Sequence, residues 1–562
     1  MKHEDKQLLK RTLKQLAPHK KKIVLVVSCF LLLTVLTFFR PMVIKSITDD
    51  GMINQNMTLI LLLSGILFLL SLVEQSVELG QTKLFLTLQN DVQFSLYKES
   101  FQKLLHLKMS YYTDKNNTGI INSLSTDINK VGLIADRGIM FLFNYIFRII
   151  SGLLGLFIIS WKLALLVLLA VPIKYIFVRL LSDKKRDLMV RALKNARDFS
   201  SWFGENINGI REIKLWNLYN QKFGQFQDKH KKVIADNKNS GMLDAWNSTY
   251  ELLLSAFMTS LLYIVGGLLI CRGELSVGDV IAFLSYSSYV LSPISAIMNM
   301  KMILAAVFPS AKRLFGFLDQ EESESGGEEP CGNSFKGICF DHVRFSYGDK
   351  ELLQDINMLI PCGAKAAIIG QNGSGKTTLI NLLLRLIQPD EGRIIMDGKD
   401  ISEYDLNSYR ELFSVVSQDP FLFQDTVRNN IDLRQRDKKD EIETVCAQSG
   451  VEGFLDKLPN GLDSKLGRNG TNLSGGEKQK LAVARALIKD APVVILDEAT
   501  SNFDVDSDAF LHDVIMEFKD KTIIMITHKY ENLKGFDLIY RIENGYLIPV
   551  ERGQEYGNCR DY

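Results

Sequence analysis

This sequence of 562 residues has almost no net charge and no cysteines at metal-ligand spacing, and each absence excludes a class of protein. The 66 Lys and Arg residues are balanced by 65 Asp and Glu, so the formal net charge is only +1 and no overall positive charge attracts nucleic acid. The seven cysteines lack metal-ligand spacing, because Cys331 and Cys339 are too far apart for a zinc knuckle and no second pair follows. We therefore expect no nucleic-acid partner, no zinc site, and free thiols in a reducing compartment.

Long runs without a charged side chain are, in contrast, abundant. Four runs have about the 17 to 25 residues that a helix needs to cross a hydrocarbon layer of about 30 Å. They cover residues 23–39, 57–73, 252–271 and 280–300. A longer stretch over 138–178 can hold two spans, with Trp161 and Lys162 at the turn between them, where an aromatic and a cation suit the headgroup level. The pattern predicts six transmembrane helices, because buried helices of a soluble protein seldom repeat such long runs.

Basic residues before the first run place the N-terminus in the cytosol. Eight Lys and Arg residues precede residue 23, whereas the short connection over 40–56 carries two basic and two acidic side chains. With six spans, the long polar connections over 80–137 and 181–246 also lie in the cytosol. We expect each connection to be a helical extension that bends once, near 114–119 and near 206–210, where Asn and Gly cluster.

The composition changes after Asp319. Residues 320–330 read Gln-Glu-Glu-Ser-Glu-Ser-Gly-Gly-Glu-Glu-Pro, an acidic stretch that cannot bury a face and marks a domain boundary. We therefore divide the chain into a transmembrane domain over 1–319, an acidic linker over 320–335 and an α/β domain over 336–562. In the last of these, a helical pattern over 376–386 alternates with short apolar runs that predict strands, at 338–347, 364–369, 493–496 and 522–526.

A glycine-rich motif directly follows the strand predicted over 364–369 and opens a helix. Glycines let successive N–H groups converge on phosphate oxygens, and the helix N-terminus adds the positive end of its dipole. Lys376 can then reach the outer phosphates, and Thr377 can bind Mg²⁺. The spacing and the strand-loop-helix context favour an ATP phosphate loop over an ordinary turn. The motif consists of Gly370, Gln371, Asn372, Gly373, Ser374, Gly375, Lys376, Thr377 and Thr378.

The strand predicted over 493–496 is followed by two acids, Asp497 and Glu498. A buried strand carries charge only where its tip enters a site, so we expect Asp497 to belong to the Mg²⁺ coordination shell and Glu498 to polarise the attacking water. A strand end on the surface can carry two acids by chance, but the neighbouring phosphate loop favours the catalytic interpretation.

A third segment reads Leu-Ser-Gly-Gly-Glu over 473–477, and a polar turn that caps the helix after it would explain this segment alone. With the six spans, the phosphate loop and the two acids in the same order, however, the whole chain resembles a half-transporter of the ATP-binding cassette (ABC) exporter family. The resemblance implies a type I exporter-like membrane domain, α-helical with long cytosolic extensions, joined to a cytosolic α/β P-loop ATPase domain. It also implies ATP and Mg²⁺ as cofactors and export by alternating access, powered by ATP hydrolysis.

In that family the 473–477 segment is the signature, which clasps the γ-phosphate of an ATP held by the other subunit. The resemblance therefore assigns Ser474, Gly475 and Gly476 to the ATP site as donors at a helix N-terminus, and it implies a dimer of nucleotide-binding domains. A homodimer with two working sites is the simplest assembly, and a heterodimer with a related half-transporter is the alternative.

Three more positions match the family one at a time. Tyr347 matches the aromatic that stacks on adenine, although a tyrosine at a strand end can equally be a packing residue. Gln418 matches the residue that touches Mg²⁺, where the simpler interpretation is a loop amide. His528 matches the switch histidine at the γ-phosphate, and we assign it with Glu498 to catalysis. Residues 114–119 and 206–216 fall where the family has its coupling helices.

Two segments depart from the family pattern. Residues 501–504 read Ser-Asn-Phe-Asp where Ser-Ala-Leu-Asp is usual, and Arg468 stands where exporters usually have Glu. The first change concerns communication between the two ATP sites, and the second concerns communication with the coupling helices. Neither change removes a catalytic group.

The substrate stays open among peptides, lipids and amphipathic small molecules. Candidate contacts are the charged residues in or near the spans, because intramembrane charge is costly, although a charge near a helix end can also snorkel or pair with a neighbour. A rival function is an ATP-gated membrane protein that does not transport. We expect an integral protein of the bacterial plasma membrane with its N-terminus and nucleotide-binding domain in the cytosol. The charged residues in question are Glu74, Glu78, Arg148 and Glu251.

Overall fold

The chain forms two compact units in the computed structural model. The membrane unit comprises Met1–Leu105 and Asn116–Glu321, and the α/β unit comprises His106–Lys115 and Glu322–Tyr562. The short segment His106–Lys115 therefore groups with the α/β unit. The residues that the structure describes are 3–113, 117–133, 137–320, 323–324, 326–332, 336–348, 350–436, 439–497, 520–528 and 533–550.

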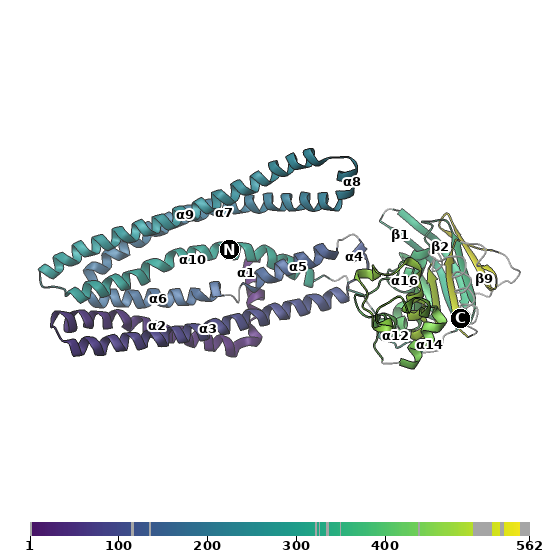
Figure 1. Ribbon diagram of the computed structural model, residues 1–562, viewed down its shortest axis with the longest axis horizontal. Helices are drawn as coiled ribbons and strands as arrows, with labels where there is room; N and C mark the ends of the chain where they lie inside the picture. Colours follow the sequence, from purple (N-terminus) through teal and green to yellow (C-terminus); the bar gives the residue numbers. More distant parts are fainter. Residues whose placement is uncertain are drawn as a thin grey trace. The chain divides into compact units, whose positions relative to one another are not determined.

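The membrane unit is built from helices (Figure 1). A helix satisfies its backbone N–H and C=O groups within itself, which a hydrocarbon layer requires because it offers no water to bond them. In chain order the helices are α1 (His3–Lys14), η1 (Ala17–His19), α2 (Lys20–Ser46), the π-helical η2 (Ile47–Ile53), α3 (Met57–Leu105), α5 (Asn117–Gly132), α6 (Arg137–Ile159), α7 (Trp161–Asn208), α8 (Ile210–Leu215), α9 (Tyr219–Cys271) and α10 (Val277–Leu318).

Five helical stretches among the described residues are long and apolar enough to cross a membrane, where six were predicted. The sixth predicted span corresponds to α6, which has 23 residues, but its described apolar part is the shorter helix Asn144–Ile159. The five stretches are Ala17–Ile53, Met57–Leu105, Trp161–Asn208, Tyr219–Cys271 and Val277–Ala296.

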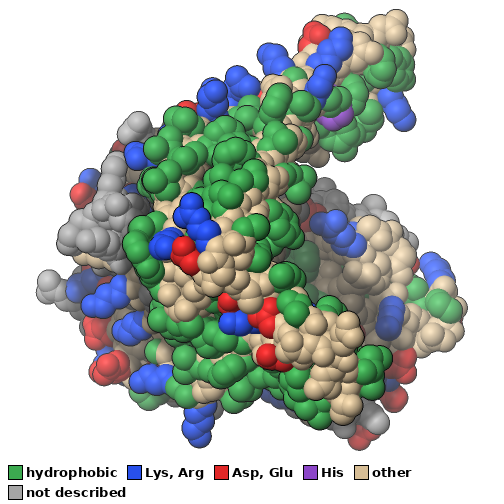
Figure 2. Space-filling view, turned by 90° about the vertical axis from the view of Figure 1, so that its left-hand side faces the viewer, with side chains coloured by type: hydrophobic (Ala, Val, Ile, Leu, Met, Phe, Trp, Pro, Cys, Tyr) green, Lys and Arg blue, Asp and Glu red, His purple; other side chains and the backbone are tan. Residues whose placement is uncertain are grey.

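Apolar side chains cover much of the surface of these helices. Figure 2 looks onto the end of the membrane unit where α6 turns into α7, and hydrophobic side chains dominate the helix flanks in this view. Leu61 and Phe68 of α3 are each 64% exposed. Water would make such a surface unfavourable, whereas lipid tails would cover it.

The predicted turn at Trp161 is confirmed. α6 ends at Ile159, α7 begins at Trp161, and the Ser160 side chain between them accepts a hydrogen bond from a backbone N–H of α7. Trp161 is 61% exposed, as a side chain at the headgroup level would be.

The two long connections differ from each other. The bend predicted near 206–210 is confirmed, since α7 ends at Asn208 and α8 separates it from α9; in Figure 1 α7 and α9 run side by side with α8 at their tip. In the other connection, α3 ends at Leu105, well before the bend predicted near 114–119. Residues 114–116 lie outside the described residues.

Two apolar clusters hold the membrane unit together. One lies among α2, α3, α5 and α10, and the other lies among α6, α7, α9 and α10. In the second cluster Tyr286 of α10 is fully buried, and its hydroxyl donates to the Phe38 carbonyl of α2 at 2.6 Å. A Cβ added at Gly155 of α6 would lie 2.6 Å from the Tyr286 ring. Glycine therefore lets α6 approach α10 closely.

The α/β unit contains two sheets. In the six-stranded sheet, ordered β10-β9-β3-β8-β7-β6, all neighbours are parallel except β10 and β9. The four-stranded sheet, ordered β2-β1-β4-β5, is antiparallel. The strands are β1 (Gly337–Tyr347), β2 (Lys350–Pro361), β3 (Lys365–Gly370), β4 (Glu391–Met396), β5 (Lys399–Asp400), β6 (Phe413–Val416), β7 (Val493–Asp497), β8 (Thr522–Thr527), β9 (Leu538–Glu543) and β10 (Tyr546–Pro549).

The predicted strands correspond to β1, β3, β7 and β8, each within one residue at either end. The helix predicted over 376–386 is shorter, because Arg385 has a left-handed φ of 53° and α11 ends at Leu383. The helices of this unit are α4 (Ser110–Thr113), α11 (Lys376–Leu383), η3 (Ile401–Glu403), α12 (Leu406–Glu411), α13 (Val427–Ile431), α14 (Lys439–Ser449), α15 (Glu452–Leu455), η4 (Gly461–Asp463), η5 (Arg468–Gly470) and α16 (Gly475–Lys489).

The expectation of free thiols holds in part. Cys339 in β1 is disulfide-bonded, and there the expectation was wrong, because pairing depends on which sulfur atoms the fold brings together and not on spacing along the chain. The free cysteines are Cys29, Cys271, Cys331, Cys362 and Cys446.

The close packing of α6 on α10 predicts that Gly155→Ala destabilises the membrane unit. The new methyl group would overlap the buried Tyr286 ring, and overpacking of this kind costs about 1–3 kcal/mol. Thermal unfolding of the purified chain in nanodiscs measures the effect. Gly267→Ala in α9 is the matched control, because no atom lies within 4 Å of its added Cβ. Equal unfolding temperatures for the two variants would contradict this packing.

Candidate nucleotide site

Four predicted site residues lie at one edge of the six-stranded sheet. Gly370 ends β3 and Asp497 ends β7. His528 directly follows β8, and Gln418 lies two residues after the end of β6. These strands are parallel, so their carboxyl ends meet at the same edge, where α/β sheets bind their ligands.

The turn between β3 and α11 has the backbone of a phosphate loop. Gly373 and Gly375 have φ angles of 79° and 106°, which side-chain-bearing residues rarely adopt, and Gly375 is the N-cap of α11. The Lys376 amine donates to the carbonyls of Gly370 at 2.9 Å and of Gln371 at 3.0 Å. The lysine therefore lies over the loop at the helix N-terminus, where an anion would be stabilised.

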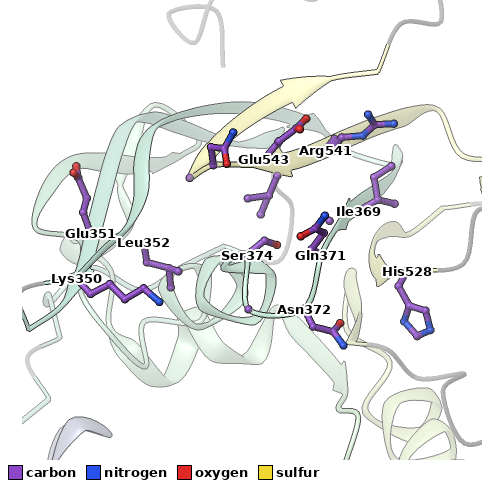
Figure 3. A pocket seen from close by; sticks show the side chains of 15 residues that line it. Lys350, Glu351, Leu352, Ile369, Gln371, Asn372, Ser374, His528, Arg541 and Glu543 are labelled. Carbon is purple, nitrogen blue, oxygen red and sulfur yellow. The ribbon is translucent and has the colours of Figure 1, made fainter.

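A cavity of about 640 Å³ opens beside this loop (Figure 3). The Ser374 hydroxyl is buried there and has no hydrogen-bond partner within the described part of the chain. A buried hydroxyl without a partner is costly, and a phosphate oxygen would accept its hydrogen bond. The loop therefore fits a nucleotide phosphate. The lining residues are Lys350, Glu351, Leu352, Ile369, Gly370, Gln371, Asn372, Gly373, Ser374, His528, Arg541, Ile542, Glu543, Asn544 and Gly545.

Two of the predicted Mg²⁺ ligands, one from the phosphate loop and one from the end of β7, lie close together. Thr377 Oγ1 donates to Asp497 Oδ1 at 3.4 Å. The described residues contain no group of three His, Cys, Asp or Glu that could hold a metal ion. A hydroxyl and a carboxylate nevertheless suit Mg²⁺, which takes few protein ligands and completes its shell with water and phosphate oxygens. The backbone carbonyl of Gln418, the third predicted ligand, accepts from Gln479 Nε2 of α16 at 3.3 Å.

The 473–477 segment does cap a helix. Ser474 is the N-cap of α16: its hydroxyl accepts from the Glu477 N–H at 3.3 Å, and the Glu477 carboxylate accepts from the Ser474 N–H at 2.8 Å. Gly475 and Gly476 form the first turn of α16. None of residues 473–477 lines the described cavity beside the phosphate loop.

The remaining predicted residues are not gathered at the cavity. Tyr347 ends β1, is 50% exposed and meets Phe345 edge to face with ring centroids 4.8 Å apart, but it is not among the lining residues. Arg468 begins the short η5 turn. Glu498 and the segment 501–504 lie outside the described residues.

The wall of the cavity opposite the phosphate loop was not predicted from the sequence. Figure 3 shows Lys350 and Glu351 from β2, and Arg541 and Glu543 from β9, around the cavity. The Arg541 Nε is buried without a hydrogen-bond partner in the described part of the structure, so it too has capacity for a ligand. No local motif marks these residues, and it is the pairing of β9 with β3 that brings Arg541 and Glu543 to the loop.

Two of the charged residues noted in the spans are paired. The Arg40 guanidinium lies 3.4 Å from the Glu74 carboxylate. Lys174, whose side chain is only 6% exposed, lies 3.2 Å from the Glu251 carboxylate and donates to the Leu291 carbonyl at 2.9 Å. In each pair the acidic side chain neutralises the charge of the basic one.

Arg148 of α6 is different. Its guanidinium lies over the Tyr289 ring, 5.6 Å from the centroid, and no carboxylate pairs with it in the described ranges. Arg148 is therefore a half-buried positive charge that an aromatic face stabilises and that no carboxylate of the described residues neutralises.

Membrane-length helices joined to a phosphate-loop unit define a transport ATPase. Two family models match this chain, the ABC transporter transmembrane region over residues 23–294 and the ABC transporter model over residues 353–501. The chain belongs to the ABC transporter family: an integral membrane protein whose nucleotide-binding unit hydrolyses ATP and couples hydrolysis to transport. Exporters of this family function as dimers in a membrane.

Named relatives cover nearly the whole chain. It is 28% identical to the ATP-dependent lipid A-core flippase of Idiomarina loihiensis over 559 residues, which are 98% of this chain and 95% of the relative. It is 27% identical to the flippase of the same name from Burkholderia thailandensis, over 90% of this chain and 86% of the relative. It is 26% identical to the uncharacterized ABC transporter ATP-binding protein YfiC of Bacillus subtilis, over 97% and 91%.

A solved structure has the same fold. A bacterial Atm1-family ABC exporter with ATP bound superposes with a TM-score of 0.78 at 21% identity, over 94% of this chain and 95% of that chain. The predicted fold class, a helical exporter-like membrane domain with a P-loop ATPase domain, is thereby confirmed. Together with the relatives, it supports ATP-driven export and does not favour an ATP-gated protein that transports nothing.

The loop geometry predicts that Gly375→Ala weakens ATP binding. The left-handed φ of 106° disfavours alanine, and the new Cβ would lie 2.7 Å from Leu353 Cδ2. We expect roughly tenfold weaker binding of a fluorescent ATP analogue, the size expected for strain of about 1–3 kcal/mol at this position. Gly363→Ala is the control, because its φ of 75° is also left-handed but nothing lies within 4 Å of its Cβ. Wild-type binding by both variants would show that the turn tolerates a side chain.

Proposed function

We propose that this chain exports an amphipathic substrate with an anionic group across the bacterial plasma membrane, driven by ATP at two shared sites of a homodimer. The observation that carries the proposal is the phosphate loop at the end of β3, with its unpartnered Ser374 hydroxyl, in a chain whose other unit consists of membrane-length helices. A nucleotide and a membrane passage in one chain are the two parts that an ATP-driven transporter needs.

The nucleotide is held mainly by the backbone of the loop. In this proposal the N–H groups of residues 370–378 surround the phosphates, and Lys376 exchanges its two loop carbonyls for the outer phosphate oxygens. Tyr347 stacks on adenine, which its half-exposed ring at the end of β1 allows.

Magnesium and the reacting water are held from the neighbouring strands. Thr377, Gln418 and Asp497 supply ligands for Mg²⁺, which neutralises phosphate charge when bound. Glu498 follows Asp497 in the chain and acts as the base that polarises the water. His528 contacts the γ-phosphate, a role supported by its place in the cavity wall next to the loop.

The signature completes the site of a second copy. Ser474, Gly475 and Gly476 form a capped helix N-terminus, whose N–H groups attract an anion, yet none of them lines the cavity of their own chain. A phosphate held by another subunit is the ligand that this turn would bind. Because this chain contains every proposed group, two identical copies make two complete sites.

The substrate class follows from the relatives and from Arg148. Two relatives are named lipid A-core flippases, and lipids are amphipathic. Arg40 and Lys174 are neutralised by acids of their own, whereas Arg148 is not paired with a carboxylate in the described residues. An unbalanced charge inside a membrane is costly, and a transient anionic group on the substrate would offset the cost.

The orientation follows from charge. The eight basic residues before residue 23 keep the N-terminus in the cytosol, and an even number of spans would bring the nucleotide-binding unit to the same side. This is the side where ATP is available.

Complementation tests the homodimer. Lys376→Met removes the phosphate contact of one chain, and Ser474→Arg blocks the signature, so each variant alone should lose ATPase activity. A mixture should regain roughly a quarter of the wild-type rate, since half of the random dimers are mixed and each mixed dimer has one intact site. Purified protein in nanodiscs, with its mass measured, is the sample.

Two outcomes would contradict the homodimer. A stable dimer whose mixture stays inactive would show that the site is not shared as proposed. An inactive monomer that is rescued only by a second gene product would establish the heterodimer instead.

Substrate stimulation of ATPase activity tests the transported class. In nanodiscs of zwitterionic lipid, anionic amphiphiles should stimulate the rate more than cationic or neutral amphiphiles of equal chain length. Arg148→Gln should reduce this stimulation about tenfold, as expected for one desolvated ionic contact. Arg186→Gln is the control, because Arg186 of α7 is exposed and lies by Asp183 and Asp187.

Glu498→Gln should abolish turnover with every amphiphile, because it removes the proposed base. Equal stimulation by cationic amphiphiles, or full stimulation of Arg148→Gln, would exclude the anionic class. Stimulation by peptides alone would assign the substrate to a different class.

A further inference from the structure

We propose that Glu324 and Arg410 are positioning residues that connect the segment 106–113 to the C-terminal end of α11, the helix that carries the phosphate loop. The inference rests on the proposed nucleotide role of that loop. It adds a physical connection between the loop that interrupts the membrane helices in sequence and the helix that would hold the phosphates.

The first part of the connection joins the linker to the segment 106–113. Leu107 and Ser323 form an antiparallel bridge, and the Glu324 N–H donates to the His106 carbonyl at 2.7 Å. Backbone contacts of this kind hold the two segments in register. The same segment makes a further contact within the α/β unit through Lys108, whose amine lies 3.5 Å from the Gln388 side-chain oxygen.

The second part is a two-bond ion pair. Arg410 of α12 donates from Nη1 and Nη2 to the two oxygens of Glu324, each at 2.9 Å. The two side chains are only 31% and 19% exposed. A planar guanidinium that meets a carboxylate with two parallel bonds fixes the angle as well as the distance between its partners.

The third part joins the same guanidinium to the two residues that directly follow α11. Arg410 Nε donates to the Leu384 carbonyl at 3.2 Å, and Nη2 also donates to the Arg385 carbonyl at 3.0 Å. The neighbouring Tyr409 hydroxyl donates to the Leu383 carbonyl at 2.6 Å. Burial raises the pKa of Tyr409, so its hydroxyl stays protonated and remains a donor. Helix α12 therefore satisfies the carbonyl of Leu383, the last residue of α11, and the carbonyls of the two residues that follow it.

One guanidinium thus binds the linker on one side and the end of α11 on the other. α11 has eight residues, about 12 Å of helix, with Gly375 and Lys376 at its other end. A helix this short moves as one piece, so a shift of Glu324 changes the position of the loop residues. The coupling is reciprocal, and a nucleotide that holds the loop should also steady the segment 106–113.

Amide hydrogen exchange of the full chain in nanodiscs tests the connection. In the wild type, the non-hydrolysable analogue AMP-PNP with Mg²⁺ should slow exchange of the Glu324 amide and of the segment 106–113 about tenfold, the size expected when one charge-assisted hydrogen bond is strengthened. Glu324→Gln and Arg410→Lys should still bind the analogue but lose this response. The double variant should respond like each single variant, because the two residues act through one contact.

Glu329→Gln is the matched control. Glu329 lies in the same linker and pairs with Lys399, but both side chains are about half exposed, at 52% and 48%, and neither touches α11 or the segment 106–113 in the described contacts. It should respond like the wild type. If Arg410→Lys unfolds, Glu324→Gln carries the test, because it leaves the α11 cap in place.

The outcomes separate this inference from the proposed function. A wild-type nucleotide response that persists in both variants would overturn the connection. A wild type that binds the analogue without any response in the segment 106–113 would overturn it as well. A wild type that does not bind the analogue at all would refute the proposed nucleotide role of the loop.

Discussion

The backbone of the turn between β3 and α11 is the constraint on which the nucleotide-binding unit depends. Gly373 and Gly375 adopt left-handed φ angles, and this lets the chain pass from a strand end into a helix with its N–H groups gathered at one point. Neighbouring residues pack closely against that turn and against the helix that follows it. Leu353 of β2 occupies the space that a Cβ at Gly375 would need, and Arg410 closes the far end of the helix. A change at either end of α11 therefore bears on the phosphate loop.

The membrane unit obeys a different constraint, because lipid offers no hydrogen bonds. Several of its buried polar groups accordingly bond within the protein, as Tyr286 does to the Phe38 carbonyl and Lys174 to the Leu291 carbonyl. Arg148 stands out against this background, since only an aromatic ring stabilises its charge in the described residues. In a transport protein, a charge without a permanent partner of opposite sign is a place where a charged substrate can bind transiently.

Much of the fold was predictable because the local sequence pattern of many elements indicates their secondary structure. The strands that became β1, β3, β7 and β8 were recognisable as apolar runs between turn residues, and the turn at Trp161 by a change in polarity. Other features depended on distant contacts. The end of α3 at Leu105 is not marked by Gly or Pro, and it coincides with the point where the chain joins the α/β unit. The spacing of the cysteines along the chain likewise did not indicate the disulfide at Cys339.

The candidate site divides in the same way. Local spacing alone was enough to place the phosphate loop, the acid at the end of β7 and the cap at Ser474, because backbone conformation and helix capping are decided within a few residues. Tertiary structure decided that Arg541 joins the cavity wall, that Arg148 has no acid beside it in the described residues, and that Arg410 links Glu324 to α11. These contacts join residues far apart in the chain, and they exist only because strand pairing and helix packing bring those residues together.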